Sequence, residues 1–157
     1  GVELTPPRDP CAPPGRNGRV RQISPALRLA TLWHDVGKIW GIRTPGAHPR
    51  TGAKLWRSVE RYPFPGLTPE EAELISFLIA NHDIFGRLER GLWDKDYKGA
   101  MDPSAIRNEL TRSGQPLAVA ARLTKELWRA DVGSVSMLRW LLPLADPLEE
   151  LVLCGSY

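Results

Sequence analysis

Three helix-start signals constrain the fold of this 157-residue chain more than any other feature. In each, a residue that favours the N-cap position is followed directly by proline: Ser24-Pro25, Thr68-Pro69 and Asp102-Pro103. Proline suits the first helical turn because the amide hydrogen that it lacks has no partner there. Glu71 lies three residues after Thr68 and completes a capping box. The sequence therefore predicts helices at three widely separated points.

Apolar periodicity extends this prediction over most of the chain. We expect helices at about 24–38, from His48 to before Pro63, at 68–82, at 102–112, within 115–142 and at 146–153. No stretch alternates polar and apolar residues as a strand does, and no internal repeat is visible. The predicted fold is all-α, a single bundle of five to seven helices over residues 24–157. Residues 1–23 carry four prolines before residue 14, so we expect a proline-rich arm or linker there.

The aromatic and apolar residues of these helices give a predicted core. We expect Leu32 and four of the six tryptophans in it: Trp33, Trp56, Trp128 and Trp140. The other two, Trp40 and Trp93, fall in predicted loops, where they either stay exposed or stack on a base.

The net charge and the small number of cysteines limit the classes of protein to which this chain can belong. The formal net charge of +3 permits an anionic partner without requiring one. Two cysteines, Cys11 and Cys154, form no disulfide framework, so we expect a reducing, cytoplasmic setting. No apolar run approaches the roughly 18 residues that span a membrane. Because the chain begins with Gly1, we expect a fragment or a trimmed chain.

Polar residues interrupt this apolar pattern at helix ends. Two histidines are each followed by an aspartate, in His34-Asp35 and His82-Asp83; His48 opens a predicted helix, and Asp131 lies within an apolar one. Taken singly, each is explained by a helix cap or a local ion pair. Taken together, they are the imidazole and carboxylate ligands that divalent metals prefer, arriving from several helices. An adjacent His-Asp pair suits such a site where a helix ends, because neighbours within a regular helix diverge by about 100°.

The stretch "HDVGK", residues 34–38, resembles the signature of the HD superfamily of metal-dependent phosphohydrolases. The resemblance covers roughly residues 24–140 and implies an all-helical bundle. It implies metal ligands at five positions: His34, Asp35, His48, His82 and Asp131. One or two ions (Mn²⁺, Fe²⁺, Ni²⁺, Co²⁺ or Mg²⁺) are implied as cofactors, with Asp35 between them.

The resemblance also implies a reaction, the hydrolysis of a phosphoester by metal-activated water. Lys38 would approach the substrate phosphate; otherwise it is an ordinary lysine at a helix C-terminus. Asp83 is a catalytic candidate that could orient His82 or a water, or else is simply a local cap of the segment after it. Arginines close to these positions are candidates for binding the anionic substrate: Arg43, Arg50 and Arg87, with Lys54 and Arg90 nearby. The alternative for these basic residues is a solvated helix face.

Two departures from the family pattern leave alternatives open. The family's first histidine should precede the signature, but no histidine lies before His34, so it is either upstream of this chain or replaced. The segment "FGRLERG" after Ile84 lacks the Gly-Tyr-Pro motif of the cyclic-dinucleotide branch. We therefore expect a hydrolase acting on a phosphorylated small molecule or a nucleic-acid end. The alternatives are a non-catalytic HD-like module that binds a nucleotide or partner, and the hydrolase part of a larger enzyme.

Overall fold

The computed structural model describes residues 24–40, 47–59 and 66–155, and these contain helices and turns but no strand. Seven α-helices and two 3₁₀-helices lie within them: α1 (Pro25–Trp33), η1 (Val36–Trp40), α2 (Ala47–Val59), α3 (Pro69–Asn81), α4 (Ile84–Trp93), α5 (Pro103–Thr111), α6 (Leu117–Ser134), η2 (Ser136–Leu144) and α7 (Ala145–Cys154). The all-α prediction is confirmed. The predicted arm at residues 1–23, and Arg43, lie outside the described residues.

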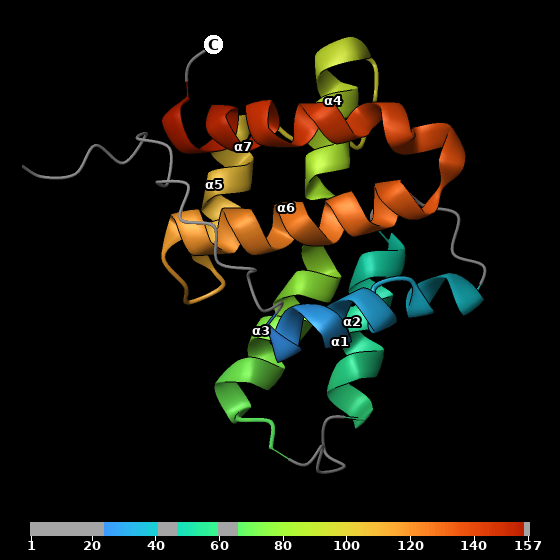
Figure 1. Ribbon diagram of the computed structural model, residues 1–157, viewed down its shortest axis with the longest axis vertical. Helices are drawn as coiled ribbons and strands as arrows, with labels where there is room; N and C mark the ends of the chain where they lie inside the picture. The colour runs from blue at the N-terminus through green and yellow to red at the C-terminus, as the bar shows by residue number, and fades with distance from the viewer. Residues whose placement is uncertain (1–23, 41–46, 60–65, 156–157) are drawn as a thin grey trace, which may run out of the picture.

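Helix α6 crosses the middle of the molecule and serves two apolar clusters (Figure 1). On one side of it lie α1, α2 and α3, whose buried residues include Trp56 and Ile79, and Leu127 of α6 packs with them. On the other side lie α4, α5 and α7, whose buried residues include Phe85, and Trp128 of α6 packs there. Because consecutive residues of α6 belong to different clusters, α6 fixes the position of the two halves relative to each other.

The predicted helix starts are confirmed by their hydrogen bonds. The Ser24 hydroxyl accepts from the Leu27 amide at 3.1 Å, and the Asp102 carboxylate accepts from the Ala105 amide at 2.7 Å. At Thr68 both halves of the capping box form, at 3.2 Å and 2.9 Å. Such caps satisfy amides that have no partner within the helix.

Several predicted boundaries and burials are wrong. Helix α1 ends at Trp33, not near residue 38, and Leu32 is 78% exposed because the buried face of α1 is formed by Ala26, Leu27 and Ala30. Trp140 is 63% exposed because the predicted long helix stops at Ser134. The chain then continues as η2, whose three-residue turn no longer matches the α-helical spacing of apolar residues.

Helix α4 was not predicted at all, and its last residue is Trp93, which the sequence analysis placed in a loop. Trp93 is 74% exposed there. The short turn at His82-Asp83 separates α3 from α4 without a glycine or proline, which explains why the sequence pattern concealed the start of a new helix.

No helix among the described residues combines the length and the apolarity that crossing a membrane requires. Cys154, the last residue of α7, is disulfide-bonded, whereas the low cysteine count had favoured a reducing setting. The cytoplasmic location stays a prediction.

A buried ion pair ties α6 to α7. The Lys125 side chain is only 8% exposed, and its ammonium donates to Glu149 and, at 2.7 Å, to Asp146. Burial alone would lower the pKa of Lys125, but the two carboxylates outweigh it and raise that pKa above its ordinary value. The charge is therefore kept in the folded state by its partners.

We expect Lys125→Met to lower the free energy of unfolding by about 2 kcal/mol, because it leaves Glu149 half-buried without its cation. The matched control is Arg129→Met, since Arg129 lies 3.9 Å from Asp146 and is 40% exposed. Thermal or denaturant unfolding should show a change of less than about 0.5 kcal/mol for this control. Equal losses for the two variants would contradict the structural role of Lys125.

Candidate metal centre

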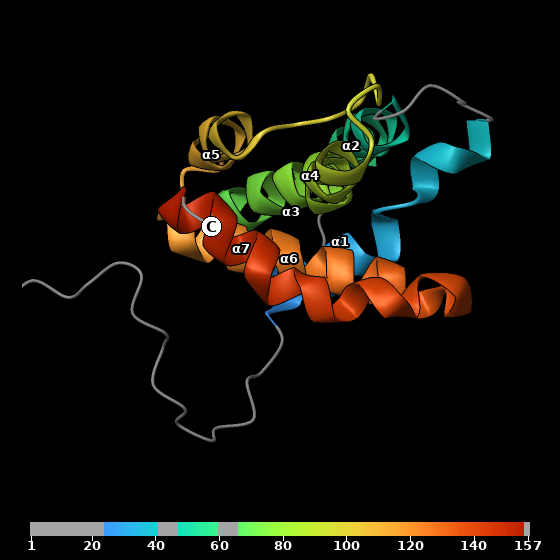
Figure 2. The same ribbon diagram turned by 90° about the horizontal axis from the view of Figure 1, so that it is seen from above.

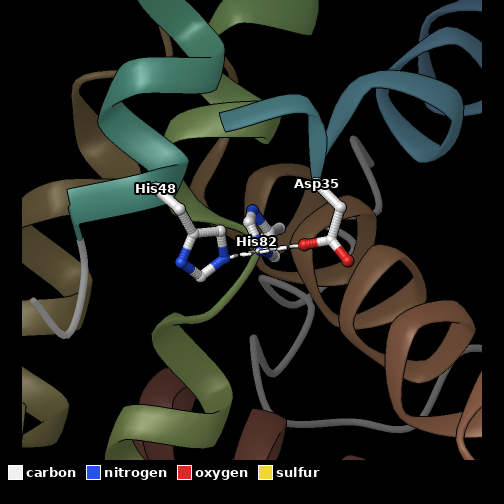
Figure 3. Close-up of side chains that lie close together, drawn as sticks. All are labelled: Asp35, His48 and His82. Carbon is white, nitrogen blue, oxygen red and sulfur yellow. Dashed lines mark hydrogen bonds and ion pairs between the residues drawn. The ribbon is translucent and has the colours of Figure 1, made fainter. Parts of the chain in front are cut away.

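Five polar side chains converge where α1, α2, α3 and α6 approach one another: His34, Asp35, His48, His82 and Asp131. Figure 3 shows three of them, Asp35, His48 and His82, pointing toward one another from three different elements. The structure thus brings together every residue that the sequence analysis named as a metal ligand.

The local fold explains how adjacent residues serve one site. His34 and Asp35 lie in the turn between α1 and η1, so the regular helix has already ended and both side chains reach the same space. Gly37 lets η1 approach the start of α2, because a Cβ at this position would lie 2.1 Å from the His48 carbonyl oxygen. The glycine therefore holds Asp35 close to His48.

The first ligand set consists of Asp35, His48 and His82. The two Nε2 atoms of the histidines are 3.2 Å apart, and they lie 3.6 Å and 3.8 Å from Asp35 Oδ1. A metal with bonds of about 2.1 Å separates tetrahedral ligand atoms by about 3.4 Å. The three atoms therefore already have close to the spacing that a small divalent ion requires.

The second set consists of His34, Asp35 and Asp131. His34 Nε2 lies 3.3 Å from Asp131 Oδ1 and 3.5 Å from Asp35 Oδ2. Asp35 is common to both sets and offers Oδ1 to the first and Oδ2 to the second. One carboxylate thus lies between two candidate sites, as the family resemblance implied. Each set supplies three protein ligands, which leaves coordination positions open in the way that catalytic metal sites do.

Backbone carbonyls orient two of the imidazoles. His34 Nδ1 lies 2.7 Å from the Thr31 carbonyl, and His82 Nδ1 lies 2.8 Å from the Ile79 carbonyl. A carbonyl only accepts, so each Nδ1 carries the hydrogen and each Nε2 faces the other ligands. Metal-binding histidines are commonly held by such a bond from the second ring nitrogen. These two carbonyls were not predicted from the sequence, although their position three residues before each histidine at a helix end was a usable signal.

An oxygen of Asp35 that has no partner is the strongest evidence that the site suits a cation. Asp35 Oδ1 is buried and has no hydrogen-bond partner, although two imidazole nitrogens face it beyond hydrogen-bonding distance. A buried acceptor without a partner costs about 1–3 kcal/mol. A divalent ion between these three atoms would remove that cost.

The pKa values of the three histidines are shifted in two directions. Burial opposes a charge on His34, but its hydrogen bonds to Asp131 and Thr31 and the nearby carboxylates outweigh it and raise the pKa above 6.5. Burial lowers the pKa of His48, and the charges of His82 and Lys38 lower it further. Burial also lowers the pKa of His82. Asp131 therefore favours the protonated form of His34, and the same hydrogen bond lowers the pKa of Asp131.

These shifts predict the titration of the metal-free protein, which has only three histidines. In NMR spectra recorded with chelator, His34 should keep its proton above pH 6.5, while His48 and His82 should lose theirs below it. Asp131→Asn should lower the pKa of His34, because it removes the anionic partner. Three indistinguishable titrations near 6.5, in either protein, would contradict the geometry.

Lys38 and Asp83 flank the site. The Lys38 ammonium donates to Asp35 Oδ2 at 2.7 Å and is half exposed, so it lies at the opening of the site. Asp83 precedes α4, but its side chain makes no capping bond, so the simple capping role is wrong. Burial raises the pKa of Asp83, although the charges of Arg87, His48 and Arg50 oppose this.

The arginines named as substrate ligands have separate environments. Arg87 Nε donates to the Gly99 carbonyl at 2.6 Å, so part of its guanidinium fixes the turn after α4. Arg50 is exposed and lines a cavity that none of the five candidate ligands lines. This cavity was not predicted from the sequence, because α2, α3 and the end of α5 supply its residues without a common motif.

Comparison with known proteins returned no match: no family model, no curated protein and no solved structure matches the chain.

Proposed function

We propose that the protein is a metal-dependent phosphohydrolase that acts on a nucleotide or a nucleic-acid phosphate. The observation that carries the proposal is the shared carboxylate of Asp35, which lies between two sets of imidazole and carboxylate ligands. Two adjacent ions with open positions are the arrangement that many phosphatases and nucleases use. The likeness of residues 34–38 to the HD signature supports the same reaction class.

Ions bound at the two ligand sets would supply Lewis acidity, which activates water and stabilises charge on phosphoryl oxygens. The protein's own side chains set up the rest. Asp35 fixes the spacing between the two sets, and the Thr31 and Ile79 carbonyls hold His34 and His82 in their required orientation. Lys38 lies at the exposed edge, where its ammonium would offset negative charge on a bound phosphate.

The proposal predicts the metal content of single variants. After loading with Mn²⁺ and dialysis, elemental analysis should find two ions per chain. His34→Ala and His48→Ala should each retain one ion, because each removes a ligand from one set only. Asp35→Ala should retain none. The control is Asp96→Ala, an exposed aspartate far along the chain from these ligands, which should retain two.

The contrary result is one ion in the unaltered chain and none in either His34→Ala or His48→Ala. It would mean that residues of both sets bind a single ion, and it would contradict two separate sites.

The proposal also predicts that a variant can lose hydrolytic activity and still bind both metal ions. With a generic phosphodiester or monoester and Mn²⁺, Asp35→Asn should reduce hydrolysis to the uncatalysed background. Lys38→Met should lower kcat by about a hundredfold, because it removes one cation from the transition state. It should still bind two ions, since Lys38 is not a ligand. Lys98→Met, which removes an exposed charge elsewhere, should keep full activity.

Hydrolysis that persists in Asp35→Asn would reject the proposed function. Hydrolysis of neither ester, with two ions bound, would instead favour a non-catalytic module that binds a nucleotide or partner. The absence of a histidine before His34 is the observation that keeps this second function open.

A further inference from the structure

A polar cavity of about 380 Å³ lies between α2, α3 and α5. Figure 2 shows α2 and α5 on the same side of α3, away from α6. The candidate metal centre instead includes Asp131 of α6 and the two residues that follow α1. The cavity is nevertheless close to that centre along the chain. Arg50 on its rim follows His48 by two residues, and Asn81 directly precedes His82. The molecule therefore presents two different polar sites on the two sides of the α2–α3 pair.

The rim of the cavity carries an excess of positive charge. Its basic residues are Arg50, Lys54 and Arg57 on one face of α2, with Arg112 directly after α5. Two acidic residues compensate part of this charge. Arg57 pairs with Glu73 at 3.3 Å, and Arg112 pairs with Glu109 at 2.9 Å.

Arg50 and Lys54 remain without an ion pair or a side-chain hydrogen bond within the part of the chain that the structure describes. They lie four residues apart, so their side chains project from neighbouring positions on one helix face. Two adjacent cations that repel each other and are not held in an ion pair form a site suited to an anion with several oxygens, such as phosphate.

The floor and wall of the cavity suit a different part of a ligand. Phe77, Ala53 and Ala80 supply apolar surface beside the basic rim. Ser76 lies at the floor, 1% exposed, and its hydroxyl has no hydrogen-bond partner. The carbonyl one turn earlier, that of Ala72, already accepts from Trp56 at 3.0 Å. A combination of charged rim, aromatic wall and buried polar floor is typical of small-molecule pockets of this volume.

We infer that this cavity binds a small phosphate-bearing ligand with a flat ring system, of the nucleotide class. Its phosphates would lie against Arg50 and Lys54, and its ring against Phe77. Binding here does not depend on the metal centre, since none of the five candidate metal ligands lines the cavity.

The test is calorimetric titration of the full chain with ADP, in excess chelator so that no hydrolysis occurs. We expect saturable binding, and a loss of affinity of at least about tenfold in Arg50→Gln/Lys54→Gln, because two charged hydrogen-bonding partners are removed. The matched control is Arg28→Gln/Lys95→Gln, which removes the same charge from two exposed positions away from the cavity. This control should bind ADP as the unaltered chain does. All four positions are exposed, so the variants are expected to fold, and thermal unfolding checks this.

Two further titrations separate this site from others. Asp35→Asn should bind ADP with unchanged affinity, and weakened binding would place the ligand at the metal centre instead. Inorganic pyrophosphate should bind more weakly than ADP, since it has no ring to contact Phe77. The inference is overturned if ADP fails to bind, if both double variants lose affinity equally, or if a short single-stranded oligonucleotide binds at Arg50 and Lys54 more tightly than ADP.

Discussion

The arrangement of this molecule depends on one carboxylate, that of Asp35, which is held between imidazoles without a full set of hydrogen bonds. One of its oxygens is buried and unpartnered, and the other is bonded to Lys38 and faces His34. A buried carboxylate oxygen of this kind is unfavourable unless a positive charge is close. The three histidines, Lys38 and the candidate metal positions all surround this carboxylate, so its placement explains why polar groups interrupt the apolar helices.

The helices hold this arrangement because α6 belongs to both apolar clusters. Asp131 lies one turn beyond Leu127 and Trp128, which pack into opposite clusters. A shift of either half of the molecule would therefore move Asp131 relative to His34. Gly37 acts at the other side, because only a residue without a Cβ allows η1 to lie against the start of α2. The candidate metal centre is thus positioned by core packing and by one close backbone contact.

Much of this could be predicted from the sequence, and the failures have physical reasons. Helix starts at Ser24, Thr68 and Asp102 were predictable because caps are local interactions. The five ligand candidates were predictable because polar residues at helix ends, and Asp131 within a helix, stand out against an apolar pattern. The exposure of Trp140 could not be predicted, since a change from α to 3₁₀ geometry leaves no clear sequence signal. The cavity was also missed, because separate helices supply its residues and only the tertiary fold brings them together.

The central claim is that the five side chains form two metal positions that share Asp35. Anomalous diffraction from crystals loaded with Mn²⁺ tests it most directly. The account predicts two peaks, one among Asp35, His48 and His82 and the other among His34, Asp35 and Asp131, with a different Asp35 oxygen directed at each. Crystals that contain Mn²⁺ only at sites away from Asp35 would contradict it.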